Sequence, residues 1–164
     1  MQKEVIQVIS GILLLIALPM LASCCVKKTI AAPTYIVKVP DSLELNGKFE
    51  AEVGNKIYFG AGSSNLSLDA KRQIERQADW LIKHSNTEVI VDGHCDERGG
   101  ADYNLNLGLK RSENTKAYLI KSGVARSRIQ VSSSGKLAEQ TNKYGPDSWE
   151  SNRVVTLTIR KIAE

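Results

Sequence analysis

The sequence has little of what a nucleic-acid-binding protein needs. Aromatic residues make up only 5% of its 164 residues, and 22 basic against 18 acidic residues leave a net charge of +4. The basic residues form no stripe, and no aromatic stacking motif of the RNA-binding kind is present. Such a mild excess of positive charge is typical of a mixed, solvated surface, so we predict no nucleic-acid partner.

Histidine and cysteine are also scarce, with 2 and 3 residues respectively. Residues 94–97 read His-Cys-Asp-Glu, but neighbours on a strand end point in opposite directions and converge poorly on one metal ion. The sequence has no Ser–His or Cys–His set with a convincing third group, and the adjacent Asp96 and Glu97 do not face across a cleft. We therefore predict a non-enzymatic protein without a metal or cofactor.

No apolar run reaches the ~20 residues of a membrane-spanning helix. The N-terminal run Gly11–Leu18 follows a charged region at Lys3 and precedes small residues, which is the order of a secretory signal. The segment 21–24, Leu-Ala-Ser-Cys, resembles a bacterial lipobox, in which the cysteine is acylated after cleavage. We predict a signal peptide over residues 1–23 and a lipid anchor on Cys24. The alternatives are an ordinary signal peptide or an uncleaved anchor with an incidental cysteine.

Cys25 directly follows the predicted lipidation site. In many such lipoproteins an aspartate at this position signals retention in the inner membrane, so its absence favours the outer membrane. Two or more acyl chains would hold the protein there stably. Cys25 and Cys95 could pair in an oxidising periplasm, but Cys95 follows a strand-like run and fits better as a buried thiol.

Residues 24–54 are predicted to form a lipidated tether, and residues 55–164 to form the folded domain. Pro33 and Pro40 interrupt the tether, although residues 35–39 could add a short strand. A flexible chain of about 28 residues spans roughly 30 Å and stretches to about 95 Å. Such a range lets a membrane-anchored domain search for a ligand below the membrane.

Hydrophobic patterning in the folded domain predicts alternating strands and helices. We expect strands at residues 56–59, 87–94, 128–133 and 153–160, one helix capped by Ser67, and a second helix over residues 102–121. A loop over residues 139–149 could hold a helical turn. This alternation predicts the α/β class, with helices packed on a small sheet.

The most informative stretch is residues 93–111, GHCDERGGADYNLNLGLKR. Asp96 lies in a glycine-containing loop after a strand, where binding groups are often displayed. Arg111 shares a helix face with Gly108 that should contact the sheet, and a buried guanidinium is costly unless it is paired. From the residues alone, its partner is either Asp96 in an internal salt bridge or a ligand.

This stretch resembles the signature of the OmpA-like peptidoglycan-binding domain, and its DERG, YN and LG elements are closest to the lipoprotein branch of that family. The resemblance covers about residues 55–160. It implies an α+β sandwich with a βαβαβ core and a mixed sheet. It also implies that Asp96 and Arg111 grip the diaminopimelate of the peptidoglycan stem peptide. The further ligand-binding residues that it implies are Arg98, Asn104, Leu107, Phe59 and Gly60.

Several of these assignments leave alternatives open. Asn104 can bond the ligand and the loop backbone or cap the following helix, while Tyr103 and Leu107 can line the pocket or pack in the core. Where the family has Phe-Asp and then a second acid, residues 59–62 read Phe-Gly-Ala-Gly, so one acceptor for a ligand ammonium is missing. The second arginine of the family's late Asn-Arg-Arg motif is Val154 here. We therefore expect weaker or altered recognition of the stem peptide.

The predicted function is that of a lipoprotein, anchored on the outer membrane by Cys24 and facing the periplasm, that ties the membrane to peptidoglycan. Members of the family's lipoprotein branch also engage the Tol system, notably the periplasmic propeller protein TolB. The resemblance therefore implies Tol partners and a role in envelope integrity and cell division. The alternative is a lipoprotein that mainly binds proteins and has a weakened wall site.

Overall fold

Four strands, four α-helices and a short 3₁₀ helix make up the described part of the chain. A computed structural model describes residues 41–136 and 145–161. In chain order the elements are α1 Asp41–Val53, β1 Lys56–Tyr58, α2 Leu68–Lys83, β2 Thr87–His94, α3 Ala101–Lys121, the 3₁₀ helix Arg126–Arg128, β3 Ile129–Gly135, α4 Pro146–Asn152 and β4 Val154–Lys161. The four predicted strands and both predicted helices are present at closely similar bounds.

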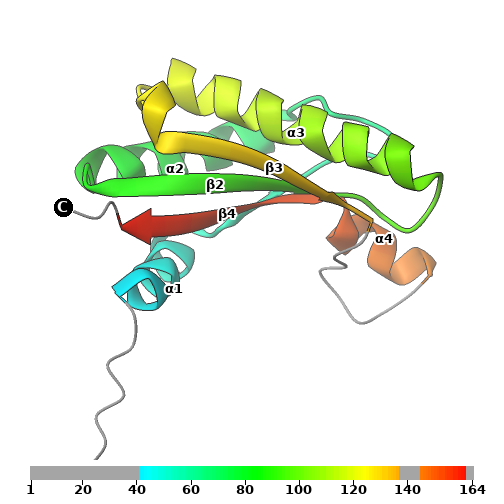
Figure 1. Cartoon of the computed structure of the whole chain (residues 1–164), viewed down its shortest axis with the longest axis horizontal. Helices are drawn as coiled ribbons and strands as arrows, with labels where there is room; N and C mark the ends of the chain where they lie inside the picture. Colours follow the sequence, from blue (N-terminus) through cyan, green and yellow to red (C-terminus); the bar gives the residue numbers. More distant parts are fainter. Residues whose placement is uncertain (1–40, 137–144, 162–164) are drawn as a thin grey trace, which may run out of the picture. The chain divides into compact units, whose positions relative to one another are not determined.

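The four strands form one mixed sheet in the order β1-β4-β2-β3. β2 and β3 run parallel, whereas β4 pairs antiparallel with both β1 and β2. Helices α2 and α3 lie together on one face of this sheet (Figure 1). The predicted α/β fold with a small mixed sheet is confirmed. Because β2 is hydrogen-bonded to a strand on each side, its carboxyl end holds the following β2–α3 loop in a fixed position.

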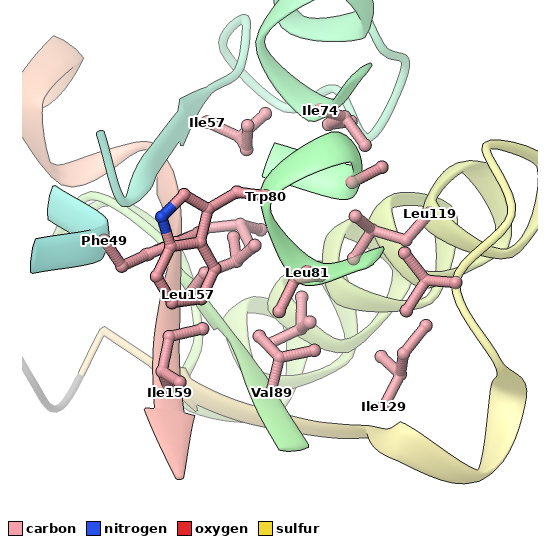
Figure 2. Packing of buried hydrophobic residues seen from close by; sticks show 14 of the residues in the cluster. Phe49, Ile57, Ile74, Trp80, Leu81, Val89, Leu119, Ile129, Leu157 and Ile159 are labelled. Atoms are coloured by element: carbon pink, nitrogen blue, oxygen red, sulfur yellow. The ribbon is translucent and has the colours of Figure 1, made fainter. Parts of the chain in front are cut away.

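The core lies between that face of the sheet and the two helices. Helix α2 starts at the predicted cap, where Ser67 Oγ accepts a hydrogen bond from the backbone N–H of Ala70 at 3.1 Å. Ile74 and Leu81 on the predicted apolar face of α2 are fully buried in the cluster shown in Figure 2. Burial of each such side chain stabilises the fold by about 1.5–3 kcal/mol.

Helix α3 meets the sheet backbone to backbone at Gly93 and Gly108. A Cβ atom on Gly93 would lie 2.0 Å from the Gly108 carbonyl oxygen, and one on Gly108 would lie 2.3 Å from Ser133 Oγ. A side chain at either position would push the helix away from the sheet. Arg111 follows Gly108 by about one turn on the same face, so this contact also places Arg111 beside the end of β2.

The prediction that the tether extends to residue 54 is wrong over residues 41–53, which form helix α1. Phe49 of α1 is fully buried and packs edge-on against Trp80 of α2, with 5.0 Å between the ring centroids. Trp80 Nε1 in turn donates to Glu52 Oε2 at 2.7 Å. The folded unit therefore begins before residue 55, and α1 belongs to it (Figure 2).

Helix α1 also covers an open edge of the sheet. β1 pairs only with the first residues of β4, from Val154 to Thr156. Farther along β4, Asn46 of α1 takes the place of a neighbouring strand: its Nδ2 donates to Ile159 O at 2.7 Å, and its Oδ1 accepts from Ile159 N at 2.6 Å. A side-chain amide thus satisfies backbone groups that would otherwise be exposed on an edge.

Several predictions lie outside the described residues. They are the signal peptide over residues 1–23, the lipid anchor on Cys24, the Cys25 partner of Cys95 and the strand over residues 35–39. Residues 139–144 of the loop over 139–149 that was expected to hold a helical turn also lie outside, and the last residues of that loop, from Pro146 on, lie in α4. Cys95 is a free, buried thiol. Among the described residues, no helix is long and apolar enough to cross a membrane.

Candidate functional site

A pocket of about 310 Å³ lies at the carboxyl end of β2. It is formed by the β2–α3 loop, the β1–α2 loop, the first turns of α3 and the residue before β4, at the end of the sheet next to α4 (Figure 1). The lining residues are Ala61, Gly62, Cys95, Asp96, Arg98, Gly99, Tyr103, Asn104, Leu107, Arg111 and Arg153. Five residues predicted for the site, at positions 96, 98, 104, 107 and 111, are therefore brought together.

Arg111 is fully buried at the base of this pocket and is held by backbone carbonyls. Its Nε donates to Ser63 O at 2.8 Å, its Nη1 to His94 O at 2.8 Å and its Nη2 to Gly60 O at 3.0 Å. Nη1 also contacts Cys95 Sγ at 3.4 Å. These bonds join the β1–α2 loop to the end of β2 through one side chain.

The charge of Arg111 has no carboxylate bonded to it among the described residues. Burial lowers the pKa of Arg111, but a guanidinium stays protonated in proteins. Its four bonds use four of its five N–H groups, and the second N–H of Nη2 has no hydrogen-bond partner among the described residues. Carbonyl dipoles stabilise the cation without cancelling its charge, so the base of the pocket remains positive.

Asp96 is bonded to two other arginines. Arg98 Nη2 donates to Asp96 Oδ2 at 2.7 Å and Arg98 Nε to Oδ1 at 3.1 Å, while Arg153 Nη1 lies 3.5 Å from Oδ2. Burial of Asp96 opposes its ionisation, but the bonds from Arg98 and Arg153 outweigh burial and lower its pKa. The internal Asp96–Arg111 salt bridge, one alternative from the sequence, is not the arrangement that the described residues adopt.

The loop that carries Asp96 is fixed against α4. Glu97 Oε1 accepts hydrogen bonds from Trp149 Nε1 and, at 3.2 Å, from Gly145 N. The Trp149 hydrogen bond is the main reason that the pKa of Glu97 is lowered. The Arg98 guanidinium lies 3.8 Å from the centre of the Trp149 ring, a cation–π distance. Arg98 therefore joins Asp96 on one side to α4 on the other.

Asn104 supports the same loop from α3. Its Nδ2 donates to Arg98 O at 2.7 Å. The alternative that Asn104 caps the helix is wrong, because α3 begins at Ala101 with Gly100 in the cap position. Tyr103 lines the pocket and is 58% exposed, so it is a wall of the pocket rather than part of the core. Leu107 also lines the pocket, one turn farther along the helix.

Phe59 and Gly60 do not line the pocket; they hold its arginines. Phe59 O accepts from Arg153 Nε at 3.1 Å, and Gly60 O accepts from Arg111 Nη2. The Phe59 ring lies 5.2 Å from the Arg111 guanidinium. Ala61 and Gly62 form the actual lining of this loop, and Gly62 has a φ of 61°, which favours glycine.

Arg153 is a charged residue of the pocket that was not predicted from the sequence. It lies directly before β4, lines the pocket and reaches Asp96 and Phe59 O. The available signal was the Asn152-Arg153 match to the family's late motif. Val154, which replaces the second arginine of that motif, is fully buried and pairs with Tyr58. The pocket therefore contains one of the two arginines of the family motif, Arg153. The position of the second arginine is occupied by the core residue Val154.

The described residues thus form a small α/β domain with an arginine-rich pocket at one end of its sheet. Residues 58–153 match the sequence model of the OmpA family. This match covers more than half of the 164-residue chain, which therefore belongs to the OmpA family.

Two curated relatives with this similarity share one name. The chain is 33% identical over 155 residues to the peptidoglycan-associated lipoprotein of Mesorhizobium japonicum, an alignment that covers 88% of each chain. It is 37% identical over 105 residues to the protein of the same name from Rhizobium meliloti, which covers 64% of this chain and 60% of that protein.

Solved structures agree with this relationship. The peptidoglycan-associated lipoprotein of Burkholderia pseudomallei has a TM-score of 0.62 and 28% identity over 65% of this chain and 90% of that chain. The C-terminal domain of Helicobacter pylori MotB has a TM-score of 0.62 at 21% identity, over 66% of this chain and 86% of that one, and supports the fold alone.

Proposed function

We propose that this chain is an outer-membrane lipoprotein that binds peptidoglycan non-covalently and links the membrane to the cell wall. Its pocket binds the stem peptide of the wall, and its activity is binding rather than catalysis. The names of the relatives from Mesorhizobium and Rhizobium support the peptidoglycan ligand. The finer assignments, the lipid on Cys24 and the facing of the domain toward the periplasm, rest on the sequence motifs.

The observation that carries this proposal is the buried Arg111 guanidinium at the base of an open pocket. It is fully buried, is bonded only to neutral groups and has one N–H remaining. A guanidinium forms short, charge-assisted hydrogen bonds with a carboxylate. Stem peptides carry several carboxylates, and Arg98 and Arg153 at the pocket wall add further positive charge.

The Tol system is the proposed partner in envelope integrity and cell division, with TolB as the first candidate. Tyr103 lines the pocket and is 58% exposed, which gives a protein partner an apolar contact next to the charged site. A partner on this surface would cover the pocket and compete with the wall.

The test is co-sedimentation of lipid-free residues 25–164, which contain the compact unit Val37–Glu164, with purified peptidoglycan. Arg98→Gln is the best variant, because the Arg98 side chain is 45% exposed and its loss should leave the fold intact. We expect the parent to pellet and Arg98→Gln to bind roughly tenfold more weakly, as one charge-assisted contact is lost.

Arg126→Gln is the matched control. Arg126 is exposed in the 3₁₀ helix before β3, at the end of the sheet away from the pocket, and the substitution makes the same change in charge. Equal pelleting by Arg98→Gln and Arg126→Gln would reject the pocket as the wall site. Failure of the folded parent to pellet would reject wall binding itself and favour the protein-binding alternative.

A further inference from the structure

We propose that the pocket selects its ligand by a carboxylate and makes little use of a ligand ammonium group. This inference rests on the proposed function, because it concerns the part of a stem peptide that the same pocket recognises. Diaminopimelate carries both groups at the end of its side chain. The balance of charge in the pocket decides between them.

The charged residues that line the pocket are three arginines and one aspartate, Arg98, Arg111, Arg153 and Asp96. Their sum is positive even when Asp96 is fully ionised. Glu97 is the next carboxylate along the loop, but it does not line the pocket, and it bonds Trp149 and Gly145 instead. A carboxylate entering the pocket is therefore attracted, and an ammonium is repelled.

The positive charge is also placed to form directed hydrogen bonds. Arg111 is fixed by three carbonyls from two segments of the chain, so its remaining N–H has a set direction. Arg153 is only 16% exposed and is held by Phe59 O and Asp96. Because these groups are already ordered, a carboxylate gains their hydrogen bonds without the entropy cost of ordering long side chains.

An ammonium would find no carboxylate that is free to accept it. Both oxygens of Asp96 are already used, Oδ1 by Arg98 and Oδ2 by Arg98 and Arg153. The β1–α2 loop contributes Ala61 and Gly62 to the lining, and neither brings a charge. Tyr103 and Asn104 offer neutral oxygens, which accept from a cation more weakly than a carboxylate does.

Three synthetic stem tripeptides separate the two groups. They share L-alanine and D-glutamate and a C-terminal amide, and they end in diaminopimelate, in 2-aminopimelate or in lysine. 2-Aminopimelate keeps the side-chain carboxylate and lacks the ammonium, whereas lysine keeps the ammonium and lacks the carboxylate. Isothermal titration of residues 25–164 with each peptide gives three dissociation constants.

We expect the aminopimelate peptide to bind within about threefold of the diaminopimelate peptide, and the lysine peptide at least about tenfold more weakly, since it loses hydrogen bonds to charged groups. Equal affinity for the lysine and diaminopimelate peptides would overturn the inference. A tenfold loss with aminopimelate would overturn it as well, because the ammonium would then be recognised.

A variant can restore recognition of the ammonium. Ala61 lines the pocket and is exposed, so a longer side chain fits there. Ala61→Asp adds a carboxylate to the lining, and Ala61→Asn adds the same shape without the charge. We expect Ala61→Asp to prefer diaminopimelate over aminopimelate by about tenfold, while Ala61→Asn keeps the parent's lack of preference. No difference between the two variants would contradict the inference.

Failure of this inference and failure of wall binding give different results. If residues 25–164 pellet with peptidoglycan but fail to discriminate between the peptides, or bind none of them, wall binding stands and carboxylate selection is wrong. If the folded protein neither pellets nor binds a peptide, both proposals are wrong.

Discussion

At the scale of single residues, Arg111 serves the fold and the site together. Its guanidinium donates to the carbonyls of Gly60, Ser63 and His94, so one loop and one strand end depend on this side chain. Removing it would leave the buried His94 carbonyl without this donor, at about 1–3 kcal/mol, and the more exposed carbonyls of Gly60 and Ser63 at less. Loss of ligand binding in an Arg111 variant would therefore not distinguish a lost contact from a lost fold, which is why Arg98 is the better probe.

Asp92 allows a residue-scale prediction of acid stability. It lies on the sheet face opposite α2 and α3 and accepts from Ser132 Oγ and Ser134 Oγ, both at 2.6 Å, and lies 3.1 Å from His94 Nε2. Partial burial raises its pKa, but the hydrogen bonds outweigh burial and lower the pKa to about 2. Its ordinary pKa is about 3.9, so the lowered value stabilises the folded state above about pH 4, and this stability is lost as the pH falls toward 2.

We expect the free energy of unfolding of the parent to fall by about 2 kcal/mol more than that of Asp92→Asn between pH 5 and pH 2. Urea unfolding at both pH values measures the difference. Asp69→Asn is the control, because the Asp69 side chain is 94% exposed and forms only a loose ion pair with Arg72. Parallel pH curves for the parent and Asp92→Asn would show that these hydrogen bonds add no stability.

At the scale of secondary-structure elements, strong periodicity was sufficient for most of the fold. The face of α2 at residues 70, 74, 78 and 81 and the β-branched run at 87–94 both identify their elements from the sequence. Helix α1 was missed because only Leu45, Phe49 and Val53 mark its buried side, and Gly47 interrupts it. Its stability comes from packing on α2 and β4, which no local pattern reveals.

The site was predictable to a similar degree. The residues within the 93–111 stretch share one motif, and the structure brings those assigned to the ligand together around the pocket. Arg153 is distant in sequence, and only the β4 pairing brings it next to Asp96. The pairing of Asp96 with Arg98 and Arg153, rather than with Arg111, depends on side-chain directions that spacing alone does not give.

One substitution, glycine to alanine, should have opposite effects in two helices. Gly47 in α1 is exposed, with nothing within 4 Å of an added Cβ, so Gly47→Ala should stabilise by about 0.5–1 kcal/mol. Gly108 in α3 would clash with Ser133 Oγ at 2.3 Å and Gly93 O at 2.8 Å, so Gly108→Ala should destabilise by about 1–3 kcal/mol. Thermal and urea unfolding of both variants measure these effects; a stabilising Gly108→Ala would show that α3 can move off the sheet freely.

The cover that α1 gives to β4 leads to a second prediction at this scale. Asn46→Ala removes both hydrogen bonds to Ile159 and exposes the strand edge. We expect a loss of about 1–3 kcal/mol in unfolding free energy and concentration-dependent association through the edge. Analytical ultracentrifugation detects the association. The control variant Lys48→Ala, on the exposed side of the same helix, should stay monomeric. Equal association of Asn46→Ala and Lys48→Ala would show that the exposed strand edge does not cause it.

At the scale of the whole molecule, the chain leads into the described domain far from the pocket. Asn46 bonds Ile159, which pairs with Val89 near the start of β2, whereas the pocket lies beyond its end. In Figure 1, α1 lies beside the end of β4, and α4 lies beside its start. The two sites are separated by about six residues of strand, or roughly 20 Å. Helix α1, the first described element, therefore lies toward the end of the sheet opposite the pocket.

Given the proposed lipid on Cys24, we propose that the length of the chain before α1 limits how far the pocket can reach from the membrane. Because α1 takes up residues 41–53, the chain between Cys24 and the domain is residues 25–40, which can span no more than about 55 Å rather than the 95 Å predicted from the sequence. Deleting residues 27–36 removes about 35 Å of that reach. We expect the deletion to reduce cross-linking of the lipid-anchored protein to peptidoglycan in cells severalfold, with no change in pelleting of the lipid-free protein. Replacing the same residues with a Gly-Ser segment of equal length should restore cross-linking, and full cross-linking by the deleted form would show that the domain is not held through Cys24.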